Sequence, residues 1–268
     1  MKKIKRVKIY VKNNNNAIHL MNILRNELLK CGFEISDVAY DLAISIGGDG
    51  TFLKMIHDNH FNSDIYYASI NAGSLGFLST FDDNGITRFV KSLQNNSFRI
   101  NTLDYISTKI IMSDLKRELS SINEFTIRKT DFSSFRCSIL IDNILLDKYI
   151  GDGLVISSPL GSTGYNMALN GVIVDNDIHG LLITPIAPIS NKVYKSLMNS
   201  IVIGHKRNIT IIPEDSSNLC FLTDGKLERI NNINKIDLSL SLNKIQYIIS
   251  DDYNYINNIR SKVLDSKE

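Results

Sequence analysis

The sequence predicts a mixed fold, with an α/β domain over residues 1–100 followed by an all-β sandwich over residues 101–249. Up to about Asn101, apolar runs typical of strands alternate with helical stretches. The chain beyond Asn101 contains short runs rich in Ile, Leu, Ser and Thr. The length of 268 residues and the 43% hydrophobic content leave enough chain for two modest domains.

In the first domain, the pattern predicts three strands and two helices in alternation. The strands cover 7–11, 42–46 and 66–70, and the helices cover about 17–31 and the stretch that follows Thr51. Strands separated by helices pair in parallel, and parallel sheets bind ligands at the carboxyl ends of their strands. Glycine-rich turns at 47–50 and 71–78 follow such ends, so we expect them to face one crevice.

The second domain is predicted from closely spaced β-runs with turn residues between them, the pattern of a sandwich. The predicted strands are 105–112, 125–128, 138–141, 154–157, 201–203, 209–212 and 236–242. The tail, residues 250–268, begins a short polar helix at about Tyr253 that we expect to pack back on the first domain. No low-complexity linker separates the halves, and a cleft between domains is a common ligand site.

Composition argues against several classes of partner. The formal net charge is +2, and Lys and Arg form no long block beyond residues 1–12, so no nucleic-acid partner is expected. That basic opening lacks the features of a signal peptide, and no apolar run is long enough to span a membrane, so no membrane partner is expected. Cys31, Cys137 and Cys220 lack disulfide or zinc spacing, which predicts a reducing, cytoplasmic environment.

The most informative segment is Ile-Ser-Ile-Gly-Gly-Asp-Gly-Thr-Phe-Leu at 44–53, where a short strand ends in three glycines around Asp49. Glycines let backbone N–H groups approach a ligand, and the amides that open the next helix attract phosphate. A carboxylate there can deprotonate an attacking hydroxyl or hold magnesium. A plain hairpin turn is the alternative, but Thr51 as a helix cap and the non-alternating residues after it favour strand, turn and helix. Neither the Walker A loop nor the dinucleotide fingerprint matches.

A second group of polar residues lies in the β-rich half, in Gly-Asp-Gly-Leu-Val-Ile-Ser-Ser-Pro-Leu-Gly-Ser-Thr-Gly-Tyr-Asn at 151–166. Turns commonly use such residues, so an ordinary turn stays open for this segment alone. Tyr165 can stack on a flat base while Thr163 meets its polar edge. Asn123 and Glu124 place an amide beside an acid, a pair that can bind the two hydroxyls of a ribose.

Together these residues resemble the NAD kinase family, whose motifs occur in order over roughly residues 40–230. The motifs are Gly-Gly-Asp-Gly-Thr at 47–51, Asn-x-Gly-x-x-Gly-Phe-Leu at 71–78, Asn-Glu at 123–124, Asp-Gly-Leu at 152–154, Gly-Ser-Thr-Gly-Tyr at 161–165, Pro-Ile-Ala-Pro at 185–188 and Thr-Asp-Gly at 223–225. The combination is far more specific than any one motif. The resemblance implies a Rossmann-like N-terminal domain, a C-terminal β-sandwich and transfer of the γ-phosphoryl of ATP to the 2′-hydroxyl of the adenosine ribose of NAD.

The resemblance also implies roles for single residues. Asp49 would accept the hydroxyl proton, with Gly50 beside it and Lys54 placed to help with the ATP phosphates. Asn123 and Glu124 would hold the substrate nucleotide. The remaining nucleotide contacts implied by the motifs and their neighbours are Asn71, Phe77 against the adenine, Asp152, Ser158, Thr163, Gly164, Tyr165, Ala168, Ala187, Asp224 and Lys226. The chain departs from the residues usual in the family at Ile150, Gly164, Ala168, Asn170 and Lys226.

The family further implies NAD and ATP as substrates, a divalent metal such as Mg²⁺ carried with ATP, and homo-oligomers, dimers or tetramers, in which neighbouring subunits complete the NAD site. No metal ligands of the protein's own are expected, and polyphosphate remains open as a phosphoryl donor. Two other functions also remain open. A lipid kinase acting on diacylglycerol or sphingoid bases shares the first glycine-rich turn but gives no reason for the Asn-Glu pair. A nucleotide-binding sensor without catalysis is suggested by Ile150 and Ala168.

Overall fold

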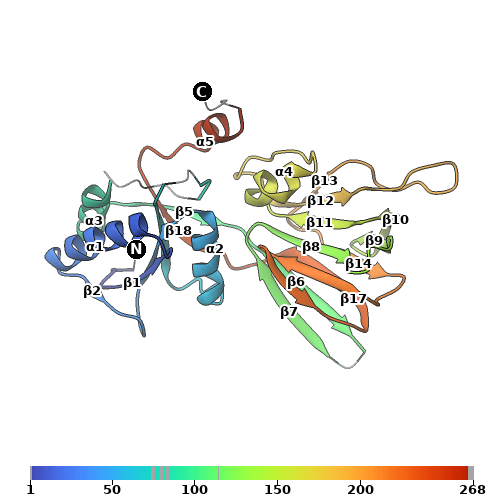
Figure 1. The fold of residues 1–268 in the computed structure, drawn as a ribbon, viewed down its shortest axis with the longest axis horizontal. Coiled ribbons are helices and arrows are strands. Elements are labelled where there is room, and N and C mark those ends of the chain that lie inside the picture. The colour runs from blue at the N-terminus through green and yellow to red at the C-terminus, as the bar shows by residue number, and fades with distance from the viewer. Residues whose placement is uncertain (1, 74–75, 79–80, 82–84, 114, 265–268) are drawn as a thin grey trace. The chain divides into compact units, whose positions relative to one another are not determined.

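The computed structural model describes residues 2–73, 76–78, 81, 85–113 and 115–264. Ser74 and Leu75 of the second glycine-rich motif, and the end of the tail after residue 264, lie outside the described residues. The chain divides into two compact units, Met1–Leu103 with Lys244–Glu268, and Asp104–Asn243 (Figure 1). The sequence assigned residues 244–249 to the second domain, but β18 (Ile245–Ile249) pairs with strands of the first unit. That part of the predicted boundary was therefore wrong.

The first unit holds a six-stranded sheet in the order β2-β1-β3-β4-β18-β5. Its strands are β1 (Arg6–Val11), β2 (Glu34–Ile35), β3 (Leu42–Gly47), β4 (Tyr66–Asn71), β5 (Arg99–Leu103) and β18. All neighbouring pairs are parallel except β18 with β5. β3 and β4 are buried almost throughout, as expected for strands covered on both faces. The three predicted strands and their parallel pairing are confirmed.

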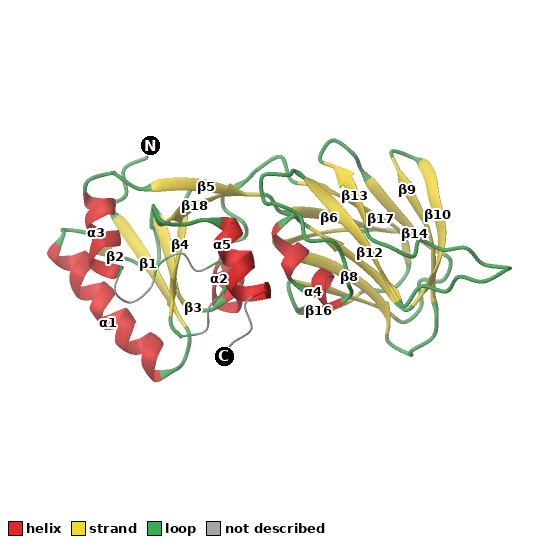
Figure 2. Ribbon diagram, turned by 90° about the horizontal axis from the view of Figure 1, so that it is seen from above, coloured by secondary structure: helices red, strands yellow, loops and turns green. Residues whose placement is uncertain are grey.

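Helices cover both faces of this sheet (Figure 2). α1 (Asn15–Lys30) and α3 (Ile86–Gln94) form one apolar core with one face of the strands. On the other face, the ring of Phe52 in α2 (Asp49–Asp58) lies 5.1 Å from the ring of Tyr247 in β18. Both predicted helices are confirmed, but α2 is capped by Gly48 and not by Thr51. α3 was not predicted, although its buried residues recur at helical spacing.

The second unit is a sandwich of two six-stranded antiparallel sheets, in the orders β10-β9-β14-β17-β6-β7 and β13-β12-β11-β8-β15-β16. The strands are β6 (Ile106–Met112), β7 (Lys116–Ser121), β8 (Glu124–Lys129), β9 (Phe135–Ile141), β10 (Ile144–Gly151), β11 (Gly153–Ser157), β12 (Gly180–Ile186), β13 (Ile201–Gly204), β14 (Ile209–Pro213), β15 (Leu219–Thr223), β16 (Lys226–Arg229) and β17 (Ile233–Leu240). Buried side chains of both sheets, such as Ile110 and Phe125, form one core. The predicted all-β sandwich and its seven predicted strands are confirmed, with shifted ends.

Short helical segments complete the two units. Between β11 and β12, a 3-10 turn (Leu160–Thr163) leads into α4 (Tyr165–Ala168). The tail forms α5 (Tyr255–Ile259) and a wider helical turn (Arg260–Leu264), and both belong to the first unit. Among the described residues, no helix has the length and apolar character that crossing a bilayer requires.

Candidate functional site

Asp49 lies at the carboxyl end of the first sheet, as the first residue of α2. The two strands that lead to the glycine-rich turns end side by side, with Gly47 of β3 paired with Asn71 of β4. A Cβ on Gly47 would lie 2.3 Å from Oγ1 of Thr51, so the helix can start here only against a glycine. The strand, turn and helix predicted for this segment are confirmed, and the hairpin alternative was wrong.

The carboxylate of Asp49 is held by the second glycine-rich motif. Its Oδ2 accepts a hydrogen bond from the N–H of Phe77 at 2.8 Å, and its Oδ1 accepts one from the N–H of Leu78 at 2.9 Å. Gly76 packs so closely that a Cβ there would lie 2.1 Å from Oδ1. Each carboxylate oxygen has a second lone pair, so Asp49 is oriented by the backbone and can still accept a proton.

Three other predicted residues lie in the same unit. The side chain of Asn71 shapes the turn, because its Oδ1 accepts the N–H of Gly73 at 3.1 Å. Gly50 is exposed, and a Cβ there would meet no atom of the described residues within 4 Å. Lys54 is exposed on α2, five residues after Asp49, roughly 7.5 Å further along the helix axis.

In the second unit, Asp224 organises the Asn123-Glu124 pair. Its carboxylate accepts hydrogen bonds from three successive backbone N–H groups, those of Ile122 at 2.8 Å, Asn123 at 2.7 Å and Glu124 at 3.3 Å. Asp224 and Gly225 form the turn between β15 and β16 with φ values of +49° and +82°, the left-handed conformation that tight hairpins need. Asp224 was predicted to contact the nucleotide, and the structure directs its carboxylate to the backbone of the pair.

The carboxyl group of Glu124 is mostly buried and incompletely bonded. Its Oε2 has no hydrogen-bond partner among the described residues. Burial, and then the negative charge of Asp224, raise the pKa of Glu124 to about 7, against the opposing hydrogen bond from the N–H of Tyr165. A Cβ on Gly164 would lie 3.1 Å from Oε2, so Gly164 and Tyr165 lie directly against this carboxyl group. A buried oxygen without a partner is suited to accept a hydrogen bond from a ligand hydroxyl.

Hydrogen bonds and close packing join the loop after β11 to the backbone beside Asn123 and Glu124. Ser158, fully buried, donates its hydroxyl to the carbonyl of Ile122 at 2.6 Å and accepts the N–H of Gly161 at 3.1 Å. A Cβ on Gly161 would lie 2.0 Å from the carbonyl oxygen of Asn123. Thr163 donates its hydroxyl to the carbonyl of Leu160 at 3.1 Å. The hydroxyls of Ser158 and Thr163, both predicted to contact the nucleotide, therefore hold the loop in place.

Asp152 and Ala187 lie at the other end of the same sheet. The N–H of Asp152 donates to the carbonyl of Ile186 at 2.9 Å, just before β11 begins and as β12 ends. Glu124 is paired with Ser157 at the far end of β11, a strand of five residues that spans roughly 16 Å. Within one chain, the structure does not bring Asp152 and Ala187 together with Glu124.

The remaining predicted residues of the second unit lie near its surface. Ala168 is exposed at the end of α4. Lys226 begins β16, next to the Asp224 turn, and its Nζ pairs with Oε1 of Glu228 at 3.2 Å. Two departures from the family pattern have structural explanations. Ile150 is buried, and Asn170 adopts φ +57°, a left-handed conformation that Asn tolerates better than most residues.

One residue near Asp49 was missed by the sequence analysis. Lys262, in the tail, donates its Nζ to the carbonyl oxygen of Gly76 and lies 4.8 Å from the ring centroid of Phe77. It is 186 residues away from Gly76 along the chain, within a short polar segment that carries no motif. No local sequence signal could have identified it.

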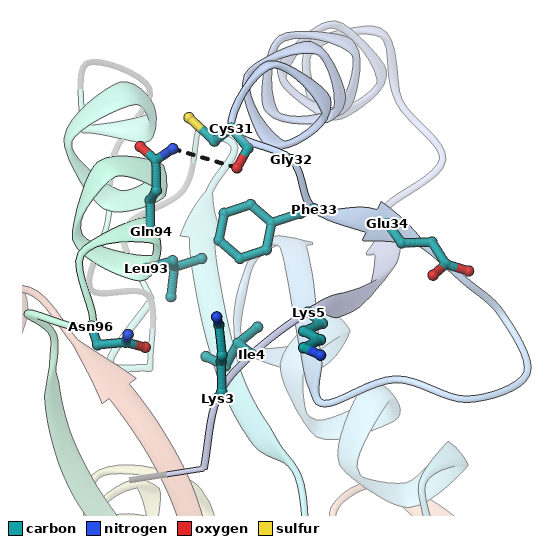
Figure 3. A pocket seen from close by; sticks show the side chains of 10 residues that line it. All are labelled: Lys3, Ile4, Lys5, Cys31, Gly32, Phe33, Glu34, Leu93, Gln94 and Asn96. Atoms are coloured by element: carbon teal, nitrogen blue, oxygen red, sulfur yellow. Dashed lines mark hydrogen bonds between the residues drawn. The ribbon is translucent and has the colours of Figure 1, made fainter.

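A cavity of about 430 Å³ lies at the opposite edge of the first sheet (Figure 3). It is lined by residues that precede β1 and by the ends of α1 and α3, including Lys3, Lys5, Cys31, Phe33, Leu93 and Gln94. The cavity therefore lies at the amino ends of the parallel strands, away from the carboxyl ends where such sheets bind ligands. Within the described parts of the chain, no group of three or more His, Cys, Asp or Glu side chains is arranged to hold a metal ion.

Comparisons with known proteins point to one family. The family model described as ATP-NAD kinase N-terminal domain matches residues 7–98, and the one described as ATP-NAD kinase C-terminal domain matches residues 122–249. A NAD kinase of Finegoldia magna is 30% identical over 270 residues, which cover 96% of this chain and 97% of that protein. A NAD kinase of Streptococcus pneumoniae is 28% identical over 246 residues, 91% of this chain and 90% of that protein.

Solved structures show the same fold. Yeast NADH kinase complexed with NADH superimposes with a TM-score of 0.87 at 18% identity, over 100% of this chain and 90% of that one. A NAD kinase from Archaeoglobus fulgidus in complex with ATP gives a TM-score of 0.75 at 19% identity, over 96% of this chain and 99% of that one. At such identities, the likeness concerns the fold.

Proposed function

Because this chain belongs to the NAD kinase family, we propose that it transfers the γ-phosphoryl of ATP to the 2′-hydroxyl of the adenosine ribose of NAD, with Asp49 accepting the hydroxyl proton. The observation that carries the role of Asp49 is its carboxylate, which is oriented by two backbone N–H groups and retains lone pairs for a proton. The family matches are to NAD kinases, which favours this function over a lipid kinase.

Phosphoryl transfer passes through a loose transition state and requires mainly alignment and neutralisation of charge. α2 begins at Asp49, and the amino end of a helix is a position where phosphate oxygens are stabilised. Lys54, exposed further along α2, adds a positive charge for the ATP phosphates. Asp49 itself orients the ribose hydroxyl and takes its proton as the phosphoryl group arrives.

A divalent ion, Mg²⁺, accompanies ATP in this proposal. Mg²⁺ in proteins takes most of its ligands from phosphate oxygens and water, with one or two carboxylates. Asp49 would hold such an ion, because its half-buried carboxylate keeps lone pairs beyond those that accept the N–H groups of Phe77 and Leu78. When bound, the ion neutralises charge on the transferred phosphoryl group.

The second unit provides the recognition of the nucleotide. The buried Oε2 of Glu124 accepts a hydrogen bond from a ribose hydroxyl, and the amide of Asn123 beside it offers both a donor and an acceptor. Tyr165, half-buried against Glu124, stacks on the base. Asp224 and Ser158 fix the backbone at Ile122 and Asn123 by hydrogen bonds. For Phe77, we propose a contact with the adenine.

We also propose that the chain works as a cytoplasmic homo-oligomer, a dimer or a tetramer. Asp152 and Ala187 lie at the far end of the sheet from Glu124, which supports a role for them in the site of a neighbouring subunit. The three cysteines form no disulfide, as in proteins of a reducing compartment. Light scattering of the purified chain measures the assembly, and a monomer would contradict the shared site.

The test of the function is an assay of NADP formation with the purified chain, NAD, Mg²⁺ and ATP. Turnover with NAD supports the proposal, whereas turnover of diacylglycerol without NADP would select a lipid kinase. Binding of NAD without turnover of either substrate would indicate a sensor. Repeating the assay with polyphosphate in place of ATP, and with NADH in place of NAD, defines the donor and the acceptor.

Gly161→Ala tests the loop that supports the Asn123-Glu124 pair. The new Cβ would meet backbone atoms of Asn123 at 2.0 to 2.7 Å, so the pair must move. We expect the KM for NAD to rise by about tenfold or more, together with a stability loss of about 1–3 kcal/mol. Steady-state kinetics and urea unfolding measure both. Gly204→Ala is the matched control, because a Cβ there meets no atom within 4 Å in the described part of the chain. Equal effects of the two variants would contradict this role.

A further inference from the structure

The C-terminal tail reaches back to the segment that holds Asp49. Lys262, in the helical turn after α5, donates its Nζ to the carbonyl oxygen of Gly76. The same ammonium group lies 4.8 Å from the centroid of the Phe77 ring, a cation–π distance. Lys262 lies beyond residues 7–98 and 122–249, which the two family models match, so the matched family domains do not include this contact.

The residues that Lys262 contacts are those that touch Asp49. Gly76 packs against the Asp49 carboxylate, and a Cβ there would lie 2.1 Å from Oδ1. The next two residues, Phe77 and Leu78, donate their N–H groups to the two oxygens of that carboxylate. Residues 76–78 therefore lie between the ammonium of Lys262 and the carboxylate of Asp49, and a shift of this backbone moves both hydrogen bonds.

The charge of Lys262 is part of this arrangement. Burial lowers the pKa of Lys262, and the negative charge of Asp49 opposes that change. An ammonium group forms stronger hydrogen bonds than a neutral donor, so the contact with Gly76 is suited to fix the backbone.

We propose that Lys262 is a positioning residue of the phosphoryl transfer, which holds residues 76–78 so that their N–H groups keep the Asp49 carboxylate aligned with the ribose hydroxyl. The proposal rests on the proposed role of Asp49. Lys262 acts through the backbone of Gly76 and Phe77, and the tail is thereby a functional part of the first unit.

Lys262→Met removes the ammonium and keeps the length and apolar stem of the side chain. Misalignment of a catalytic group commonly costs up to about 10²-fold, so we expect kcat for NADP formation to fall by about tenfold to 100-fold. The KM values for NAD and ATP should change by less than about threefold, because the methionine side chain still packs against the Phe77 ring and the other proposed binding groups do not touch Lys262 in this proposal. Lys262→Arg should restore most of the lost kcat, since a guanidinium can also donate to the Gly76 carbonyl.

The control is Lys91→Met, which removes an exposed lysine of α3 in the same unit and should leave kcat and KM unchanged. Circular dichroism and the melting temperature check that each variant is folded. If Lys262→Met fails to fold, the comparison of Lys262→Arg with Lys262→Gln carries the same test, because only the arginine retains a charged donor. A Lys262→Met protein with native kcat, or one with an increased kcat, would overturn the proposal.

The double variant Asp49→Asn with Lys262→Met separates this inference from the proposed function. If Lys262 acts through Asp49, then its loss lowers kcat by less than about threefold once Asp49 has been replaced. A further tenfold to 100-fold loss in the double variant would show an independent role for Lys262 and overturn the positioning proposal. Native activity of Asp49→Asn alone would instead overturn the role of Asp49, whatever the result for Lys262.

Discussion

Asp49→Asn is expected to lower kcat for NADP formation by about 10² to 10⁴-fold, the range that general-base assistance contributes. Asn has nearly the same shape but cannot take the hydroxyl proton, and its single oxygen can accept only from one side of the amide group. One of the two N–H groups, that of Phe77 or of Leu78, would then face an NH₂ donor. Single-turnover kinetics with saturating NAD and ATP isolate the chemical step from binding.

The matched control for this variant is Asp58→Asn, which makes the same chemical change at an exposed position of the same helix. We expect native kcat and a native melting temperature for Asp58→Asn. Asp49→Asn should melt at a lower temperature, because one of the two N–H groups loses its acceptor, and its melting curve checks that it is folded. An Asp49→Asn protein that still forms NADP at a near-native rate would contradict the role of Asp49 as proton acceptor.

The second large effect concerns the pH dependence of stability and Glu124. Burial and the charge of Asp224 raise the pKa of Glu124 in the folded protein from the ordinary 4.5 to about 7. Below about pH 4.5 the group is protonated in both the folded and the unfolded chain, and its contribution to stability is fully present. As the pH rises toward 7, the unfolded chain loses this proton while the folded chain retains it, so the contribution is lost.

Glu124→Gln removes this titration. At ~1.4 kcal/mol per pKa unit, the free energy of unfolding of the wild-type protein should fall by on the order of 3 kcal/mol relative to that of the variant as the pH rises from about 4.5 to 7. Urea unfolding of the ligand-free proteins at several pH values measures the difference. The control is Glu118→Gln, at a side chain that is 68% exposed on β7, which should give a curve parallel to the wild type. A parallel curve for Glu124→Gln would show that the carboxyl group is not buried as described.

Several parts of the fold followed from local pattern alone. The apolar run that ends in Gly47 predicts a buried strand, and the residues after Thr51 predict a helix, because hydrophobic periodicity reflects which face is buried. α3 was missed even though Ile86, Phe89, Val90 and Leu93 recur at helical spacing. β18 was assigned to the wrong unit because its partners, β4 and β5, are remote in the sequence and leave no local trace.

The candidate site divides in the same way. Asp49 was predicted from the glycines around it, because glycines let a backbone approach a ligand closely. Asn123 and Glu124 were predicted because an amide beside an acid can bind ribose hydroxyls. Asp224 and Ser158 were also found, but as nucleotide contacts, whereas the structure directs their oxygens to backbone groups around Asn123. A motif indicates which residue type the site requires at a position, but it does not indicate which atom that side chain will bind.

The sequence was sufficient to indicate the family, the two-unit plan and the residues at the ends of the strands, because these depend on periodicity and on short motifs. The hydrogen bonds that orient Asp49, the three amides collected by Asp224 and the contact of Lys262 with Gly76 came from the folded chain alone. Each of them joins residues that are far apart along the chain. Such contacts depend on how the strands pair and how the tail returns, and no local pattern encodes that geometry.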